Sequence, residues 1–179
     1  FFKLIRKRVG WLLALFLSEL LTTSAMTYFS DEMQKVAILS IFIPLITSSG
    51  GNSGSQASTL IIQAMALGEV SLKDWWRIMR REIFSGLVLG IILGAVGFLR
   101  IQIWHELLQH GIMHMHDPAI RNSYLTHSTA VGFTIGFSLI GIVLWGTLTG
   151  SMLPILLKRL GADPAASSSS VIVGAAYGP

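Results

Sequence analysis

A polar, glycine-rich stretch lies inside a hydrophobic run that is long enough to cross a membrane. The run extends from Val36 to Leu67, and the polar stretch within it extends from Pro44 to Thr59. Polar side chains in hydrocarbon are costly unless they face the interior of a helical bundle or a water-filled path. The sequence therefore predicts that this segment either lines a polar path or packs tightly between helices.

The polar residues of this stretch recur at helical spacing. Steps of three or four positions place side chains on one face of an α-helix. The residues on that face are Ser48, Asn52, Gln56, Thr59 and Gln63. Gly50, Gly51 and Gly54 remove side chains next to this face, and Pro44 removes one backbone hydrogen bond before it. Two interpretations stay open: an ion path lined by oxygen atoms, and a small-residue packing seam in which Asn and Gln join helices.

The composition indicates an integral membrane protein. Of the 179 residues, 52% are hydrophobic and 12% are charged, whereas about a quarter of the residues in a soluble domain are charged. The absence of cysteine excludes disulfides and thiolate metal sites. The basic residues behind the net charge of +4 cluster beside hydrophobic spans, so no nucleic-acid partner is expected. No nucleotide-binding fingerprint is present, which argues against ATP-driven pumping and against an organic cofactor.

Five transmembrane helices are expected after a basic interfacial segment at residues 1–10, giving an all-α, multi-pass fold. The approximate spans are 11–29, 36–68, 82–103, 128–157 and 163–179. We place the N-terminus in the cytoplasm. Of the thirteen Lys and Arg residues, only Lys35, Arg100 and Arg121 would then lie outside, in agreement with the positive-inside rule.

Four acidic residues are further candidates for contact with a cation. Glu19 lies within the first span, where a carboxylate indicates either a functional site or a hydrogen-bonded packing role. Asp31 and Glu32 follow that span and could concentrate cations there, or act only as a solvated cap. Asp163 precedes Pro164 at the start of the last span, where a helix N-cap is the simpler interpretation.

The longest connector, expected from Trp104 to His127, holds all five histidines. His114 to Asp117 resemble a patch for a soft or transition metal. The alternative is an amphipathic interfacial helix that binds no metal. Magnesium prefers oxygen ligands and is not expected here. A membrane-embedded metalloenzyme would need ligands that converge within the spans, so no enzymatic activity is expected.

The segment from Gly50 to Gln56, Gly-Gly-Asn-Ser-Gly-Ser-Gln, together with Pro44 before it, resembles the signature of the MgtE family of magnesium channels and transporters. Residues 66–70 and 156–165 are also similar to that family. The resemblance covers nearly the whole chain, residues 1–179. It corresponds to the family's transmembrane domain, and no counterpart of the family's cytosolic sensor domains is expected in this sequence.

The resemblance implies a homodimer in the cell membrane, with an ion path at the subunit interface lined by the second and fifth helices. Mg²⁺ is then the transported ion, and the partners are the lipid bilayer, a second copy of the chain and divalent cations. The residues expected along the path are Asn52, Gln56, Ser55, Thr59, Ser48 and Glu19. The family usually carries an acidic residue on its fifth helix, and Tyr177 stands at the corresponding position here.

These observations predict channel-like transport of magnesium down its electrochemical gradient. Mg²⁺ keeps several of its waters in proteins, so hydroxyl and amide oxygens at hydrated-ion distance suit it. An inside-negative potential supplies about 2.3 kcal/mol per charge per 100 mV, which makes ATP unnecessary. Two alternatives stay open: a non-conducting membrane anchor or assembly module with the same fold, and a divalent-cation transporter of different selectivity.

Overall fold

The computed structural model describes the backbone of residues 2–35 and 37–160, with most of their side chains. Every element in these ranges is a helix, as expected for an all-α protein. The elements are α1 (Phe2–Tyr28), α2 (Ser30–Lys35), α3 (Ile38–Ala66), the 3₁₀ helix η1 (Leu72–Asp74), α4 (Trp75–Gln109) and α5 (Pro118–Arg159). Two residues that bear on the expected ion path, Asp163 and Tyr177, lie outside the described residues.

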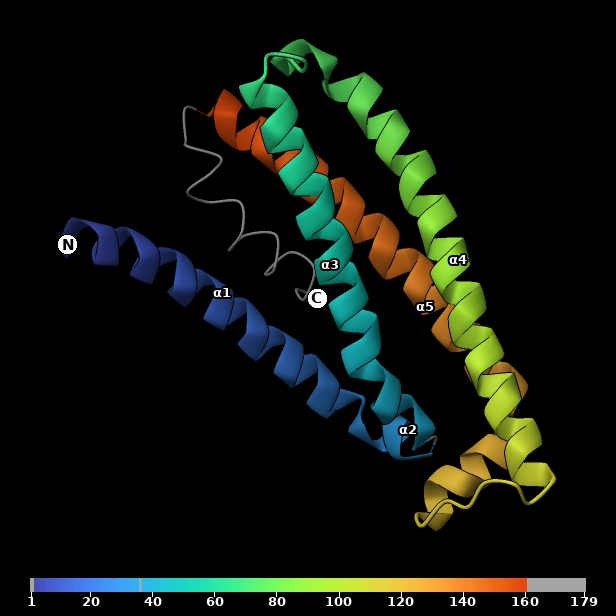
Figure 1. The fold of residues 1–179 in the computed structure, drawn as a ribbon. Helices are drawn as coiled ribbons and strands as arrows, with labels where there is room; N and C mark the ends of the chain where they lie inside the picture. The colour runs from blue at the N-terminus through green and yellow to red at the C-terminus, as the bar shows by residue number, and fades with distance from the viewer. Residues whose placement is uncertain (1, 36, 161–179) are drawn as a thin grey trace.

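Helix α5 is the element on which the bundle is assembled. Both α3 and α4 pack along it, whereas α1 makes its principal contact with α2 and extends away from the bundle (Figure 1). Gly146 of α5 lies against the backbone of Gly50 in α3. Further along both helices, Gly150 lies against the backbone of Gly54. Residue numbers rise together along this contact, so α3 runs parallel to α5.

Helix α4 packs antiparallel to α5 along a row of glycines. The buried glycines of α4 are Gly86, Gly90, Gly94 and Gly97. A Cβ atom on Gly90 would lie 2.9 Å from the Cα atom of Ile140, and one on Gly94 would lie 2.7 Å from the carbonyl oxygen of Gly136. Any side chain would therefore push the helices apart. In the sequence these four glycines recur at near-four spacing, which predicts a close-packing helix face, and the structure confirms it.

Two apolar clusters hold the three helices together at opposite ends. The first consists of Ile38, Phe42, Ile101, Leu108, Tyr124, Val131, Ile135 and Leu139. The second consists of Ile61, Met65, Ile78 and Ile155. Each cluster draws residues from α3, α4 and α5, so the glycine contacts lie between two regions of larger side chains.

Two segments among the described residues are long and apolar enough to cross a membrane, Leu72–Gln109 and Pro118–Arg159. Helix α3 has 29 residues, and at 1.5 Å per residue it extends about 43 Å, more than the ~30 Å hydrocarbon core of a bilayer. Its polar residues lower its average hydropathy. The expected fifth span, residues 163–179, lies outside the described part of the chain, and the number of spans stays a prediction.

Helices α4 and α5 both run beyond the spans expected for them. The non-helical segment between them therefore comprises residues 110–117 and is shorter than the connector expected over 104–127. His105 and His127 consequently lie on helices rather than in a loop. At the start of α5, the carboxylate of Asp117 accepts a hydrogen bond of 2.8 Å from a first-turn backbone N–H, which stabilises the early helix start.

Candidate ion-binding site

The polar residues of α3 form one exposed face of that helix, here named the α3 polar face. Its members are Ser48, Asn52, Ser55, Gln56, Thr59 and Gln63, and all six are exposed. The opposite face is buried and contains Gly50, Gly51, Gly54, Ala57, Ser58, Ile61 and Met65. The two interpretations of the motif therefore apply to different sides of the same helix: the glycines form the packing seam, and the amides lie on the other side.

The motif glycines allow the backbones of α3 and α5 to touch. A Cβ atom on Gly50 would lie 2.6 Å from Cγ1 of Ile142. A Cβ atom on Gly146 would collide with the carbonyl oxygen of Gly50, and one on Gly150 would collide with that of Gly54. Because this contact fixes the rotation of α3 about its own axis, it also fixes the direction in which the α3 polar face points.

Several hydroxyl groups of α3 donate their protons to the helix's own carbonyl oxygens. Thr59 Oγ1 donates to the carbonyl oxygen of Ser55 at 2.8 Å, and Thr47 Oγ1 donates to that of Ile43 at 2.9 Å. A hydroxyl that has donated its proton to the backbone keeps its lone pairs as acceptors. The Thr59 hydroxyl on the α3 polar face can therefore accept a hydrogen bond from another molecule.

The amide side chains on this face form few hydrogen bonds with other described residues. Asn52 Nδ2 donates to Ser48 Oγ at 3.5 Å, a long and weak hydrogen bond. The side chains of Gln56 and Gln63 form no hydrogen bond with any other described residue, and both are exposed. Three amide oxygens, separated by one or two helical turns, are thus free to accept hydrogen bonds along the length of α3.

This arrangement suits a hydrated cation better than a dehydrated one. The waters around Mg²⁺ point their protons outward, and Mg²⁺ gives up these waters reluctantly. A row of neutral acceptor oxygens can bind such waters. Among the described residues, the α3 polar face includes no carboxylate that would replace a water in the inner shell of the ion.

The other predicted residues lie apart from this face or outside the described residues. Glu19 is exposed on α1, which contacts chiefly α2. Asp31 is exposed on α2. The side chain of Glu32, and all of Asp163, fall outside the described part of the chain. Pro44 is exposed within α3, and the helix continues through it.

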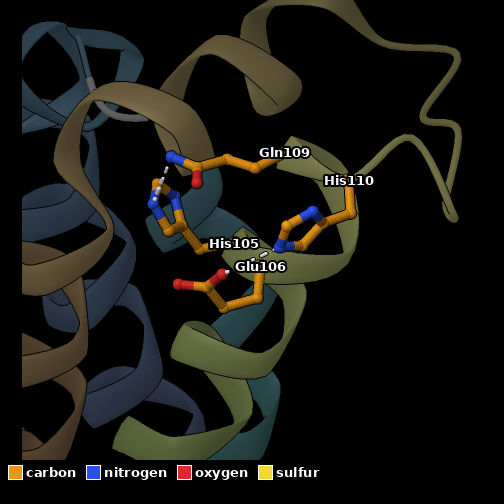
Figure 2. A network of polar contacts seen from close by, with 4 residues as sticks. All are labelled: His105, Glu106, Gln109 and His110. Carbon is orange, nitrogen blue, oxygen red and sulfur yellow. Dashed lines mark hydrogen bonds and ion pairs between the residues drawn. The ribbon is translucent and has the colours of Figure 1, made fainter.

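A separate polar network lies at the C-terminal end of α4, shown in Figure 2. His105 Nδ1 lies 2.8 Å from the carbonyl oxygen of Tyr124 on α5, and Gln109 Nε2 lies 2.9 Å from His105 Nε2. His110 Nε2 lies 3.6 Å from Glu106 Oε2. The contact to Tyr124 crosses from one helix to the other, so His105 helps to hold α4 and α5 together.

The histidines form no metal centre within the described residues. No group of three His, Asp or Glu side chains comes close enough to hold a metal ion there. His114 and His116 are both exposed in the 110–117 connector. The resemblance of this segment to a transition-metal patch is therefore not supported by the geometry of the described residues.

Helix α5 contributes residues to this region that were not among those predicted from the sequence. Gly146 and Gly150 form the backbone contact with α3, and Thr147 and Ser151 are buried beside them. Ser58 of α3 is only 3% exposed, and its hydroxyl has no hydrogen-bond partner in the described part of the chain. The four-residue spacing of the two α5 glycines was the available signal, since it matches the spacing of Gly50 and Gly54.

A protein-family model described as a divalent cation transporter, MgtE, matches residues 43–175. The matched range begins next to Pro44 and includes the whole α3 polar face, α4 and α5. The match thus covers the helices that form the bundle and the motif that orients the polar face.

Three curated proteins named magnesium transporter MgtE are similar to this chain. The protein of Thermus thermophilus is 34% identical over 167 residues, which are 92% of this chain and 32% of that protein. The protein of Enterococcus faecalis is 26% identical over 170 residues, 95% of this chain and 33% of its own length. The protein of Bacillus subtilis is 25% identical over 166 residues, 93% and 32% respectively. The chain spans about a third of the length of these relatives.

Proposed function

Because this chain belongs to the MgtE family of divalent cation transporters, we propose that it carries Mg²⁺ across the cell membrane along the α3 polar face. The observation that carries the proposal is the exposure of this face while the glycine side of the same helix is packed against α5. A helix with only a packing role would bury its amides against a neighbour. Here the amides point away from α5, against which the glycine side of α3 packs.

The α3 polar face needs a covering other than lipid. Polar side chains are rare against hydrocarbon and normally face a bundle interior or a water-filled cavity. We propose that a second copy of the chain supplies this covering, so that two polar faces line one path in a homodimer. Residues 163–179 are proposed to form a fifth span beside it. The similarity to proteins named magnesium transporter MgtE supports Mg²⁺ as the ion that this path carries.

Transport by this path would keep the hydration shell of the ion. The amide oxygens of Asn52 and Gln56 and the hydroxyl of Thr59 would accept hydrogen bonds from its waters. Neutral acceptors bind a divalent ion less tightly than carboxylates do. Conduction requires binding that is strong enough for entry and weak enough for release. A row of such acceptors therefore favours passage over capture.

The membrane potential is sufficient as a driving force. We propose that the N-terminus and the basic segments around Lys73–Arg81 and Lys158–Arg159 lie in the cytoplasm, as the positive-inside rule requires of five spans. Each charge that moves inward gains about 2.3 kcal/mol per 100 mV, and a divalent ion gains about twice that. No coupled reaction is needed for uptake, so the proposed mechanism is channel-like.

A second candidate is a divalent-cation transporter with a different selectivity. It is favoured by the lack of any carboxylate on the α3 polar face in the described residues. Neutral oxygens discriminate among divalent cations mainly by the size and stability of the hydrated ion. Calcium exchanges its waters more readily, so it is the ion against which selectivity should be tested.

The proposal is tested by magnesium flux into liposomes that contain the purified chain and an entrapped magnesium indicator. An inside-negative potential should produce magnesium uptake that exceeds calcium and sodium uptake. Asn52→Leu and Gln56→Leu should each reduce the flux by about tenfold, because each removes an acceptor worth about 1.5 kcal/mol to the ion's shell. The matched control is Gln102→Leu, which makes the same chemical change on α4 and should leave the flux unchanged.

Three results would change the assignment. Wild-type magnesium flux in both Asn52→Leu and Gln56→Leu would remove the α3 polar face from the mechanism. Equal uptake of calcium and magnesium would favour the second candidate. A folded protein without any flux would indicate a membrane anchor or assembly module.

A further inference from the structure

A groove of about 410 Å³ opens between the first turns of α4 and the last turns of α5. The residues that line it include Trp75, Met79, Met152, Leu153, Leu156 and Arg159. Apart from Thr149 and Arg159, every residue of its lining is apolar. The groove thus has hydrophobic walls and one cationic side chain, and it lies far along α4 and α5 from the histidine network.

The groove exists because the glycine seam between α4 and α5 ends before these turns. Gly86 is the seam glycine nearest to the start of α4, and a Cβ atom there would collide with Thr147. Beyond it, α4 presents Ile78, which packs against Ile155 of α5. Larger contact residues keep helix axes further apart. The two helices accordingly diverge toward the start of α4 (Figure 1), and the apolar cluster around Ile155 forms one wall of the space between them.

Two tryptophans place this end of the groove at a membrane surface. Trp75 and Trp76 are 46% and 54% exposed. Their rings meet edge to face, with centroids 5.5 Å apart. Exposed tryptophans at the ends of membrane helices lie at the level of lipid headgroups. The interior of the groove consequently faces acyl chains, and its open end faces headgroups.

The cationic side chain of the groove has no acidic partner in the described residues. Arg159 and its neighbour Lys158 are exposed at the end of α5. The nearest turn, η1, contains one acid, Asp74, which is already engaged by Ser71. Its Oδ2 accepts a hydrogen bond of 2.9 Å from the N–H of Ser71 and one of 2.6 Å from the Ser71 hydroxyl. Positive charge therefore remains available at the groove's open end.

We propose that this groove binds one anionic phospholipid, with an acyl chain along Met79 and Leu153 and the phosphate on Arg159. Basic pockets between membrane helices bind anionic headgroups, and a long Arg side chain reaches the headgroup level readily. A second groove in the molecule provides a comparison that supports the role proposed for Arg159. This groove of about 400 Å³, between Phe98 and Phe133, includes no charged residue in its lining. It offers the same volume without a reason to select anionic lipids.

The test is retention of lipid by the purified chain in detergent, measured by native mass spectrometry during titration with phosphatidylglycerol or phosphatidylcholine. Phosphatidylglycerol should be retained preferentially, at one copy per chain. Arg159→Gln should weaken that retention about fivefold, since one basic residue is worth about 1 kcal/mol toward an anionic lipid. Leu153→Trp should lower retention of both lipids at this site by filling the groove.

Two matched controls separate the site from general effects of charge and bulk. Arg77 lies in the first turn of α4 but does not line the groove. Arg77→Gln should therefore leave lipid retention unchanged. Ala95→Trp fills the second groove and should preserve the preference for phosphatidylglycerol. Circular dichroism establishes that each variant is folded, and Arg159→Gln alone decides the question if Leu153→Trp does not fold.

Equal retention of the two lipids, or an equal loss in Arg77→Gln and Arg159→Gln, would overturn the proposal. Lipid retention is measured without magnesium and without a potential. Its failure would therefore leave the transport proposal untouched, and a failure of magnesium flux would leave the lipid site untouched.

Discussion

Helices α3 and α4 pack against α5 by the same device but present opposite chemistry on their outer sides. Both press buried glycines onto α5. The outer side of α4 exposes large apolar residues, such as Phe84 at 71% and Ile92 at 54%. The outer side of α3 exposes the hydroxyl and amide groups of the α3 polar face. The glycines therefore determine how closely the helices approach one another. The outer residues determine whether each helix can face lipid or a polar environment.

The comparison separates two roles of the segment from Gly50 to Gln56: helix packing by its glycines and the proposed contact with the cation by its amides. In α3, the glycines and the amides alternate within one short segment, so changes a few positions apart fall on opposite sides of the helix. Glycine-side changes should damage folding and leave no functional protein to assay. Amide-side changes should leave the fold intact and alter transport. Helix α4 supplies the controls, because its glycines pack on α5 in the same way while its outer side is apolar.

The largest effect is expected from Gly150→Leu, which breaks the contact shared by α3 and α5. Its side chain would have to occupy the place of the Gly54 carbonyl, and overpacking of this kind costs about 3 kcal/mol. Thermal unfolding in detergent, followed by circular dichroism, should show a clear loss of stability. Gly141→Leu is the matched control, because a Cβ atom there meets nothing within 4 Å. Equal unfolding temperatures for the two variants would contradict the backbone contact.

An intermediate effect is expected when a polar group is placed on the outer side of α4. Ile92→Asn puts an amide where we expect lipid, and an unpartnered amide in apolar surroundings costs about 1–3 kcal/mol. The unfolding temperature should fall, while magnesium flux per folded molecule should stay at the wild-type level. Gln56→Leu should do the reverse, with stability kept and flux lost. If Ile92→Asn proves neutral, the outer side of α4 does not face hydrocarbon.

The smallest effect is expected from Glu19→Gln. Its side chain is exposed on α1, away from the helix that carries the α3 polar face, and an exposed substitution of this kind changes energies by no more than about 0.5 kcal/mol. Flux should remain within about twofold of wild type at every pH tested. A large or pH-dependent change would place Glu19 on the ion path in the assembled protein and would extend the site beyond α3.

Local periodicity was sufficient to predict the two faces of α3 and the glycine face of α4. Ser48, Asn52 and Gln56 are spaced by one helical turn, and any regular helix brings them to one side. The structure confirms that they share an exposed face. The same reasoning succeeded for Gly90 and Gly94. The length of the helices was less predictable, because the turn at residues 110–117 depends on the Asp117 cap rather than on hydropathy.

Which helix receives each glycine face could not be predicted from spacing. Gly146 and Gly150 belong to α5, and nothing in their local pattern specifies α3 rather than α4 as the neighbour. The choice depends on the joint fit of Ile142 against Gly50 and Ile140 against Gly90. The lipid groove is likewise a consequence of where two helices stop touching. It has no signature in either helix taken alone.

The chemistry of each helix face, the helical class and the membership of the MgtE family follow from the amino-acid sequence, because these depend on residue types at short, regular spacing. The packing of the helices was needed to show that the motif's glycines serve the contact with α5 while its amides are left exposed. Side-chain direction relative to a distant helix is set by backbone contacts between residues such as Gly54 and Gly150, nearly a hundred positions apart. Such contacts depend on the fit of three helices at once, which no local pattern specifies.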